Sequence, residues 1–161
     1  MIDCGLLQPY LLGNNENEQG YYKIPAYAQG NNLTEAQWAD FLLADFTCPN
    51  SLEARNRVKY GVPTWQFRYF GDWDNIRLYP TSGAYHGSDL QMIFGGAEDL
   101  SGLPNSVPES LATVMMQHAW ATFAEDPQNG LSKKLLWPQF DPERTSNHCH
   151  SACVGSSGVS N

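Results

Sequence analysis

The stretch that most constrains the fold is Gly83-Ala84-Tyr85-His86-Gly87-Ser88-Asp89-Leu90, a histidine that leads straight into an apolar run. The run has the spacing of a short helix, with Leu90, Met92, Ile93 and Phe94. Residues 65–70, an aromatic run with strand character, precede it. We therefore expect His86 on a loop or helix edge just beyond a strand. A histidine in that place is either a hydrogen-bonded structural residue or a catalytic imidazole aimed at a cleft.

Length and composition predict one globular domain. The chain has 161 residues, of which 42% are hydrophobic and 12% aromatic. The net charge of −8 and the lack of a Lys/Arg cluster argue against nucleic acid as a partner. No apolar run is long enough to span a membrane. We expect residues 1–144 to form the folded part and the Ser/Gly-rich residues 145–161 to be a disordered tail.

Carboxylates follow the first predicted strand. Residues 9–13 have the pattern of a short buried strand that ends in the turn-forming Gly13-Asn14-Asn15. Glu16 and Glu18 come directly after this turn. Two carboxylates in such a place are either residues of a solvated turn or the source of the acid that orients a catalytic histidine.

Helix signals divide the rest of the chain. Thr34-Glu35-Ala36-Gln37 is a capping box, and we expect its helix to end before Cys48-Pro49. A second helix is expected over residues 51–60. Ser106-Val107-Pro108-Glu109 caps a long helix that stops at residues 125–127. Its predicted apolar face, which includes His118 as a packed core histidine, is formed by Leu111, Met115, His118, Trp120 and Phe123.

The cysteines and one asparagine bear on the compartment. Cys4, Cys48, Cys149 and Cys153 permit disulfides, and Asn32-Leu33-Thr34 makes Asn32 a glycosylation candidate. Both features favour an oxidising compartment, whereas the first five residues do not resemble a signal peptide. The tail places four zinc-type ligands too close together for one tetrahedral site, namely His148, Cys149, His150 and Cys153. We expect no metal and no cofactor.

Several stretches, in the same order along the chain, resemble the C-terminal part of the type-B carboxylesterases. This α/β-hydrolase group also contains cholinesterases and fungal lipases, and the secreted fungal branch is the most similar. The matching segments are Leu11-Leu12-Gly13-Asn14-Asn15-Glu16-Asn17-Glu18, Phe46-Thr47-Cys48-Pro49, residues 83–90, Ile93-Phe94-Gly95, Trp120-Ala121-Thr122-Phe123-Ala124 and Trp137-Pro138-Gln139-Phe140. The resemblance implies an α/β fold, here the end of an α/β-hydrolase sheet with its packing helices.

The resemblance also assigns roles. The family's catalytic acid falls on Glu18, with Glu16 as a neighbour, and its catalytic histidine falls on His86. In such a triad the histidine takes the proton of a serine and returns it to the departing alcohol, while the acid holds the imidazole tautomer. The family often bridges a cysteine placed like Cys48 to a later one, which would be Cys149 or Cys153.

The chain departs from the family in three ways. It contains no Gly-x-Ser-x-Gly nucleophile motif and no Gly-rich oxyanion-hole loop. The interval from Glu18 to His86 is shorter than in cholinesterases, and the residues after Asn147 do not resemble the family's ending. We therefore expect a C-terminal portion of a secreted enzyme that supplies the acid and the histidine but not the serine.

Two kinds of function follow from this interpretation. The first is part of an ester hydrolase that acts on a small-molecule or lipid ester and is inactive without the N-terminal portion of its domain. The second is non-catalytic: a cholinesterase-like interaction module, or a remnant of a gene model with no separate role. An exposed apolar patch that a partner covers would favour the interaction module.

Overall fold

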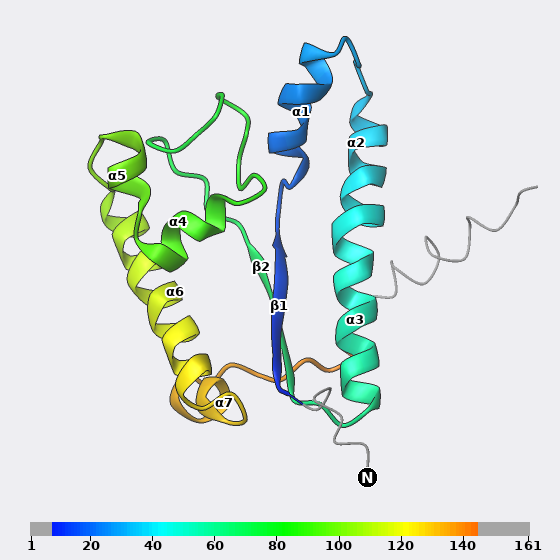
Figure 1. The fold of residues 1–161 in the computed structure, drawn as a ribbon, viewed down its shortest axis with the longest axis vertical. Coiled ribbons are helices and arrows are strands. Elements are labelled where there is room, and N and C mark those ends of the chain that lie inside the picture. The colour runs from blue at the N-terminus through cyan, green and yellow to red at the C-terminus, as the bar shows by residue number, and fades with distance from the viewer. Residues whose placement is uncertain (1–7, 145–161) are drawn as a thin grey trace, which may run out of the picture.

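The computed structural model describes residues 8–144, a two-stranded parallel sheet with helices on both faces (Figure 1). Strand β1 (Tyr10–Asn15) pairs with β2 (Thr64–Tyr69), with Tyr10 opposite Thr64 and Asn15 opposite Tyr69. Both strands therefore end at the same edge of the sheet, where the loops that follow them start side by side. This mixture of helices and strands is compatible with part of an α/β fold.

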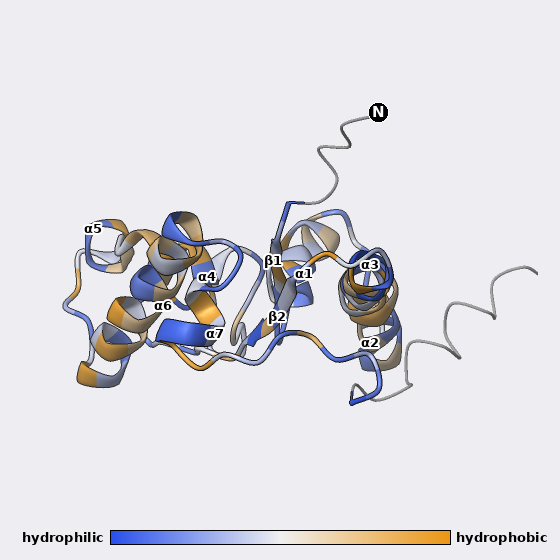
Figure 2. Cartoon of the chain, turned by 90° about the horizontal axis from the view of Figure 1, so that it is seen from below, coloured by the Kyte–Doolittle hydropathy of each residue, from blue (hydrophilic) through white to orange (hydrophobic). Residues whose placement is uncertain are grey.

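The helices form two layers around the sheet (Figure 2). The crossover from β1 to β2 contains α1 (Gln19–Ala28), α2 (Glu35–Leu42), the π-helix η1 (Leu43–Thr47) and α3 (Cys48–Lys59). The layer on the other face contains α4 (Ser88–Phe94), α5 (Ala97–Ser101), α6 (Val107–Glu125) and α7 (Gly130–Lys134).

Neighbouring strand residues are buried on opposite faces, as the period of two in a strand requires. Leu12 packs against Ala54 of α3 and against Phe140. Trp65 packs against the other layer, at Ala119 of α6 and Leu131 of α7. A third apolar cluster lies under the long loop between β2 and α4 and fixes that loop to α4, α5 and α6; its buried members are Tyr69, Ile76, Ala84, Met92, Ala97 and Met116.

The local signals predicted several elements correctly. Both expected strands are present, and both capping boxes are confirmed. Thr34 Oγ1 accepts the Gln37 N–H at 3.3 Å while Gln37 Oε1 accepts the Thr34 N–H at 2.8 Å. Ser106 and Glu109 make the same reciprocal pair at the start of α6, and α6 ends at Glu125 as expected.

The predicted helix end before Cys48-Pro49 is wrong. The helix that begins at Glu35 continues through the five-residue π turn η1 into α3, which begins at Cys48 rather than at residue 51. Pro49 is tolerated because it lies in the first turn of α3, where the missing N–H matters least. Helix α1 was not predicted from the sequence, because it contains Pro25 and Gly20, two poor helix formers.

The predicted apolar face of α6 is also wrong. Leu111 and Met115 are exposed, and so is His118, which is therefore not a core histidine. The face turned to the core has the buried residues Glu109, Thr113, Met116, Ala119 and Thr122. Trp120 and Phe123 do pack inward, with the Trp120 ring 5.0 Å from that of Phe67. Apolar residues surround the whole of α6, so periodicity alone did not identify the buried side.

Gly13 tests how tightly β1 and β2 pack. A Cβ at this position would lie 2.4 Å from the Phe67 carbonyl oxygen and 2.5 Å from its ring, where no atom fits. Gly13→Ala should therefore lower the free energy of unfolding by about 1–3 kcal/mol, measured by urea denaturation. The control is Gly96→Ala, whose new Cβ meets only the end of the Gln91 side chain at 3.2 Å. Equal stability of the two variants would contradict this account of the sheet.

Candidate active site

A carboxylate and an imidazole meet at the edge where both strands end. Glu18 follows β1 by three residues, and His86 lies in the loop between β2 and α4. His86 Nδ1 is 2.7 Å from Glu18 Oε2, and Glu18 Oε1 accepts the Asn15 N–H at 2.6 Å. Glu18 is 4% exposed, whereas the His86 side chain is 46% exposed. The pair thus combines a buried acid with a histidine that a solvent-side group can reach.

Hydrogen bonds from Asn17 join the two loops directly. The Asn17 N–H donates to the Ala84 carbonyl at 3.0 Å, and Asn17 Nδ2 donates to the Ser82 carbonyl at 2.7 Å. Gly20 lets the chain pass the same loop closely, because a Cβ there would lie 2.4 Å from the Ser82 carbonyl oxygen. The loop that carries His86 is therefore attached to the segment that carries Glu18.

Asn15 binds residues that lie before and after His86 in the chain. Its Nδ2 donates to the Tyr85 carbonyl at 2.7 Å and to Asp89 Oδ1 at 3.1 Å, while its own N–H binds Glu18. Gly87, with a φ of +85°, turns the chain from His86 into α4. The buried Asn15 thus links the acid, the backbone before His86 and the first turn of α4 in one network.

Three aromatic side chains lie beside the imidazole. The ring centroids of Tyr22, Phe46 and Tyr21 lie 5.3, 5.5 and 6.3 Å from that of His86. Tyr21 and Tyr22 come from α1 and Phe46 comes from η1. None of the three was singled out from the sequence. Tyr21 and Tyr22 come just after Glu18, and Phe46 opens the family-like segment Phe46-Thr47-Cys48-Pro49; these positions were the signals that could have indicated them.

This arrangement suits proton transfer. If the Glu18 carboxylate accepts the Nδ1 proton, Nε2 keeps its lone pair and acts as a base toward a group on the open side. In the part of the chain that the structure describes, the side-chain hydrogen bond of His86 goes to the Glu18 carboxylate.

The remaining candidates divide between described and undescribed residues. Asn32 is exposed in the loop between α1 and α2, as a glycosylation acceptor must be. Cys48 is 1% exposed at the start of α3. Cys149 and Cys153, with His148 and His150, lie outside the described residues. Over residues 8–144 no three metal-ligating side chains gather at one point, and no helix there is long and apolar enough to cross a membrane.

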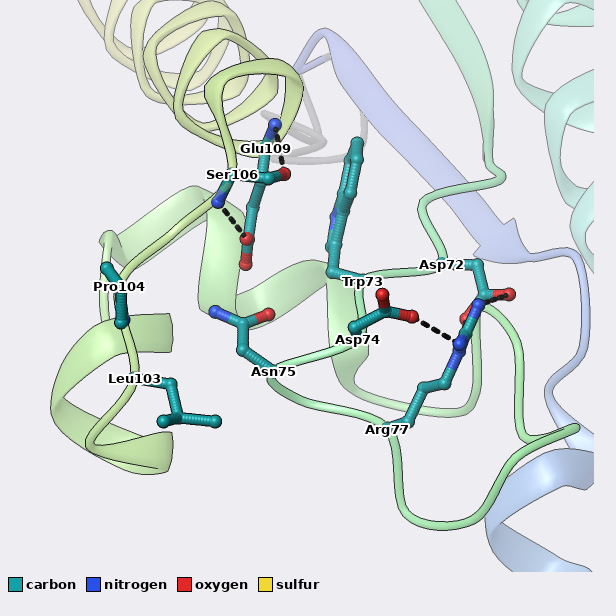
Figure 3. A pocket seen from close by; sticks show the side chains of 9 residues that line it. All are labelled: Asp72, Trp73, Asp74, Asn75, Arg77, Leu103, Pro104, Ser106 and Glu109. Atoms are coloured by element: carbon teal, nitrogen blue, oxygen red, sulfur yellow. Dashed lines mark hydrogen bonds and ion pairs between the residues drawn. The ribbon is translucent and has the colours of Figure 1, made fainter.

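A separate cavity of about 590 Å³ lies between the loop after β2 and the start of α6 (Figure 3). Arg77 bridges Asp72 and Asp74 on its rim, and the Arg77 hydrogen bond lowers the pKa of the Asp72 carboxyl. Glu109 lines the cavity and accepts the Ser106 N–H of the capping box. Neither Glu18 nor His86 lines this cavity, so it is not part of the candidate active site.

The chain is similar to fungal secreted lipases and to an esterase, although no protein-family model matches it. It is 33% identical over 144 residues to Secreted lipase 5 of Gibberella zeae. The alignment covers 85% of this chain and 26% of that protein. Over 83 residues it is 35% identical to the Chlorogenic acid esterase of Aspergillus niger, covering 52% of this chain and 16% of that protein. Over 89 residues it is 29% identical to Secreted triacylglycerol lipase LIP1 of Gibberella zeae. That alignment covers 55% of this chain and 13% of that protein.

The similarity supports a place in a lipase/esterase family. The chain spans about a quarter of the length of the first of these relatives, where the alignment covers 26%.

Tyr85, next to His86, allows a test of whether this loop is packed against the core. Burial raises the pKa of Tyr85, whose hydroxyl donates to the Ile76 carbonyl at 2.9 Å. A raised pKa means that the folded state holds the proton more tightly than the unfolded state, so stability is complete below about pH 10 and falls as the pH rises further. Urea unfolding from pH 8 to 11 should show this decline, with a smaller slope in Tyr85→Phe. An unchanged slope would contradict a buried, protonated Tyr85.

Proposed function

We propose that this chain is the C-terminal portion of a secreted, serine-dependent carboxylic-ester hydrolase of the type-B carboxylesterase family, with the α/β-hydrolase fold. The observation that carries the proposal is the 2.7 Å contact between His86 Nδ1 and the buried Glu18 carboxylate, at the carboxyl ends of adjacent parallel strands. The similarity to two secreted lipases and an esterase adds support.

In this proposal the serine hydroxyl donates to His86 Nε2. The imidazole takes that proton as the serine oxygen attacks the ester carbonyl, and it then gives the proton to the departing alcohol. The same nitrogen next deprotonates a water molecule that hydrolyses the acyl-enzyme. Glu18 holds the Nδ1–H tautomer and stabilises the imidazolium that forms in each step.

The serine is proposed to come from another segment of the hydrolase domain, joined at the outer edge of β1. Tyr10 donates its N–H to Pro63, just before β2, and Glu16 donates its N–H to Tyr69 of β2. The backbone groups of Leu11 therefore point away from β2, as does the Gly13 carbonyl, which accepts from Asn50. A neighbouring strand could pair with this outer edge and bring the nucleophile to the same end of the sheet as His86.

A chimera tests the proposal directly. Residues 8–144 of this chain would replace the aligned segment of Secreted lipase 5. The chimera should hydrolyse p-nitrophenyl esters, and His86→Ala and Glu18→Gln should each lower kcat/KM by about 10⁴-fold or more.

The matched control is Glu16→Gln. This neighbouring carboxylate is exposed and pairs with Arg68 at 2.7 Å, so its loss should leave kcat/KM nearly unchanged. An active chimera whose rate does not depend on His86 would overturn the assignment of the base.

The chain by itself should show no esterase activity above the background rate. Acid and base without a nucleophile cannot form an acyl-enzyme. The measurement is incubation of the full chain with a serine-directed fluorophosphonate, followed by mass spectrometry. Stoichiometric labelling of one defined serine would show that this chain carries its own nucleophile.

Exposed apolar residues on the outer side of α6 favour a second candidate, a non-catalytic interaction module. The most exposed are Val107 at 75%, Leu111 at 67% and Val114 at 64%. The chimera separates the two candidates, since an interaction module predicts a chimera without ester hydrolysis.

A further inference from the structure

The π turn η1 lies beside the candidate base. The helix that starts at Glu35 would be regular up to Lys59 if η1 were absent, but at this point the Cys48 N–H bonds the Leu43 carbonyl, five residues back. Turns of this kind are rare within helices and are frequent at functional sites. The residue of η1 that contacts His86 is Phe46.

The π turn is what places Phe46 on the same side as Phe41. In a regular α-helix residues five apart are about 140° apart around the axis, so the two rings would point in different directions. Here one π turn separates them, and their ring centroids are 5.7 Å apart. Tyr22 contacts both, at 5.2 Å from Phe41 and 5.9 Å from Phe46.

Contacts on both sides of the π turn prevent the helix from rotating away. Upstream, Trp38 is 4% exposed and its ring lies 5.7 Å from that of Phe41. Downstream, Ala54 is fully buried against Leu12, and Asn50 Nδ2 donates to the Gly13 carbonyl at 2.9 Å. The extra residue of the π turn therefore lets Trp38 and Ala54 both face the core, although a regular helix would point them in different directions.

We propose that Phe46, placed by this π turn, is a positioning residue for His86, which rests on the proposed function of the Glu18–His86 pair. Phe46 and Tyr22 flank the imidazole at 5.5 and 5.3 Å and keep it in the rotamer in which Nδ1 meets Glu18. The Nε2 edge, opposite Nδ1, stays open. Without the aromatic contacts, one hydrogen bond alone would hold a half-exposed side chain that has other staggered rotamers available.

The test is NMR of the His86 ring in the full chain, with ¹⁵N-labelled imidazole. The wild type should show one rotamer and an Nδ1–H tautomer bonded to Glu18. Phe46→Leu, which keeps an apolar side chain but removes the ring, should raise the population of other His86 rotamers about fivefold, the ratio typical of one aromatic contact. Phe94→Leu is the matched control, since Phe94 lies at the end of α4 and its side chain is 77% exposed.

A second variant tests the π turn itself. Deletion of Ala44, an exposed residue of η1, restores a regular helical phase and should release His86 although Phe46 is still present. If circular dichroism shows that the deletion unfolds the chain, Phe46→Leu decides alone. An unchanged His86 spectrum in Phe46→Leu would overturn the positioning role. Failure of the proposed function would give a different result. The wild-type His86 spectrum would then show no Nδ1–H bond to Glu18, and Glu18→Gln would leave that spectrum unchanged.

Discussion

The Glu18 carboxylate lies almost entirely out of water, and the architecture around it depends on keeping that charge paired. A buried carboxylate is stable only when hydrogen bonds replace its hydration. Glu18 has two partners, the Asn15 N–H on one oxygen and His86 on the other. The first comes from the end of β1 itself, while the second must be brought from a distant part of the chain.

The sheet and the buried asparagines provide that second partner. Parallel pairing makes β1 and β2 end together, so a loop from each begins at the same edge. Asn15 and Asn17 then bind the backbone just before His86, at Ser82, Ala84 and Tyr85. Asn15 also binds the Asp89 side chain, which follows His86. Ile76 and Ala84 anchor the same loop to the core under α4 and α6. The imidazole is therefore placed by the backbone of its loop, and the aromatic rings act on its side chain.

Local chemistry made part of this structure predictable. The two strands and both capping boxes are set by residues within a few positions of each other. The pairing of Glu18 with His86 came from the family resemblance, because nothing in the spacing of two distant residues fixes their contact. The π turn was not predictable from the sequence. It brings two buried faces of one helix, that of Trp38 and that of Ala54, into the directions that the packed fold requires, and those directions exist only in the fold. The prediction of the buried face of α6 was wrong for a related reason. Val107, Leu111 and Met115 are exposed, although they are more apolar than the buried Glu109, Thr113 and Thr122.

The two edges of the sheet show which part of the site the described residues determine. On β2 the Thr64 carbonyl accepts the Phe140 N–H at 2.7 Å. On β1 the Gly13 carbonyl accepts from Asn50, and the Asn15 N–H donates to Glu18. At the end of β1 nearest the site, these two outward backbone groups are therefore hydrogen-bonded to side chains of this chain. The outward backbone groups of Leu11 are left at the opposite end, in the part of the chain that the structure describes. The Glu18–His86 contact is therefore formed entirely by described residues, with no strand paired to the outer edge of β1. In the proposed function, a strand added there would decide where the proposed serine lies relative to His86.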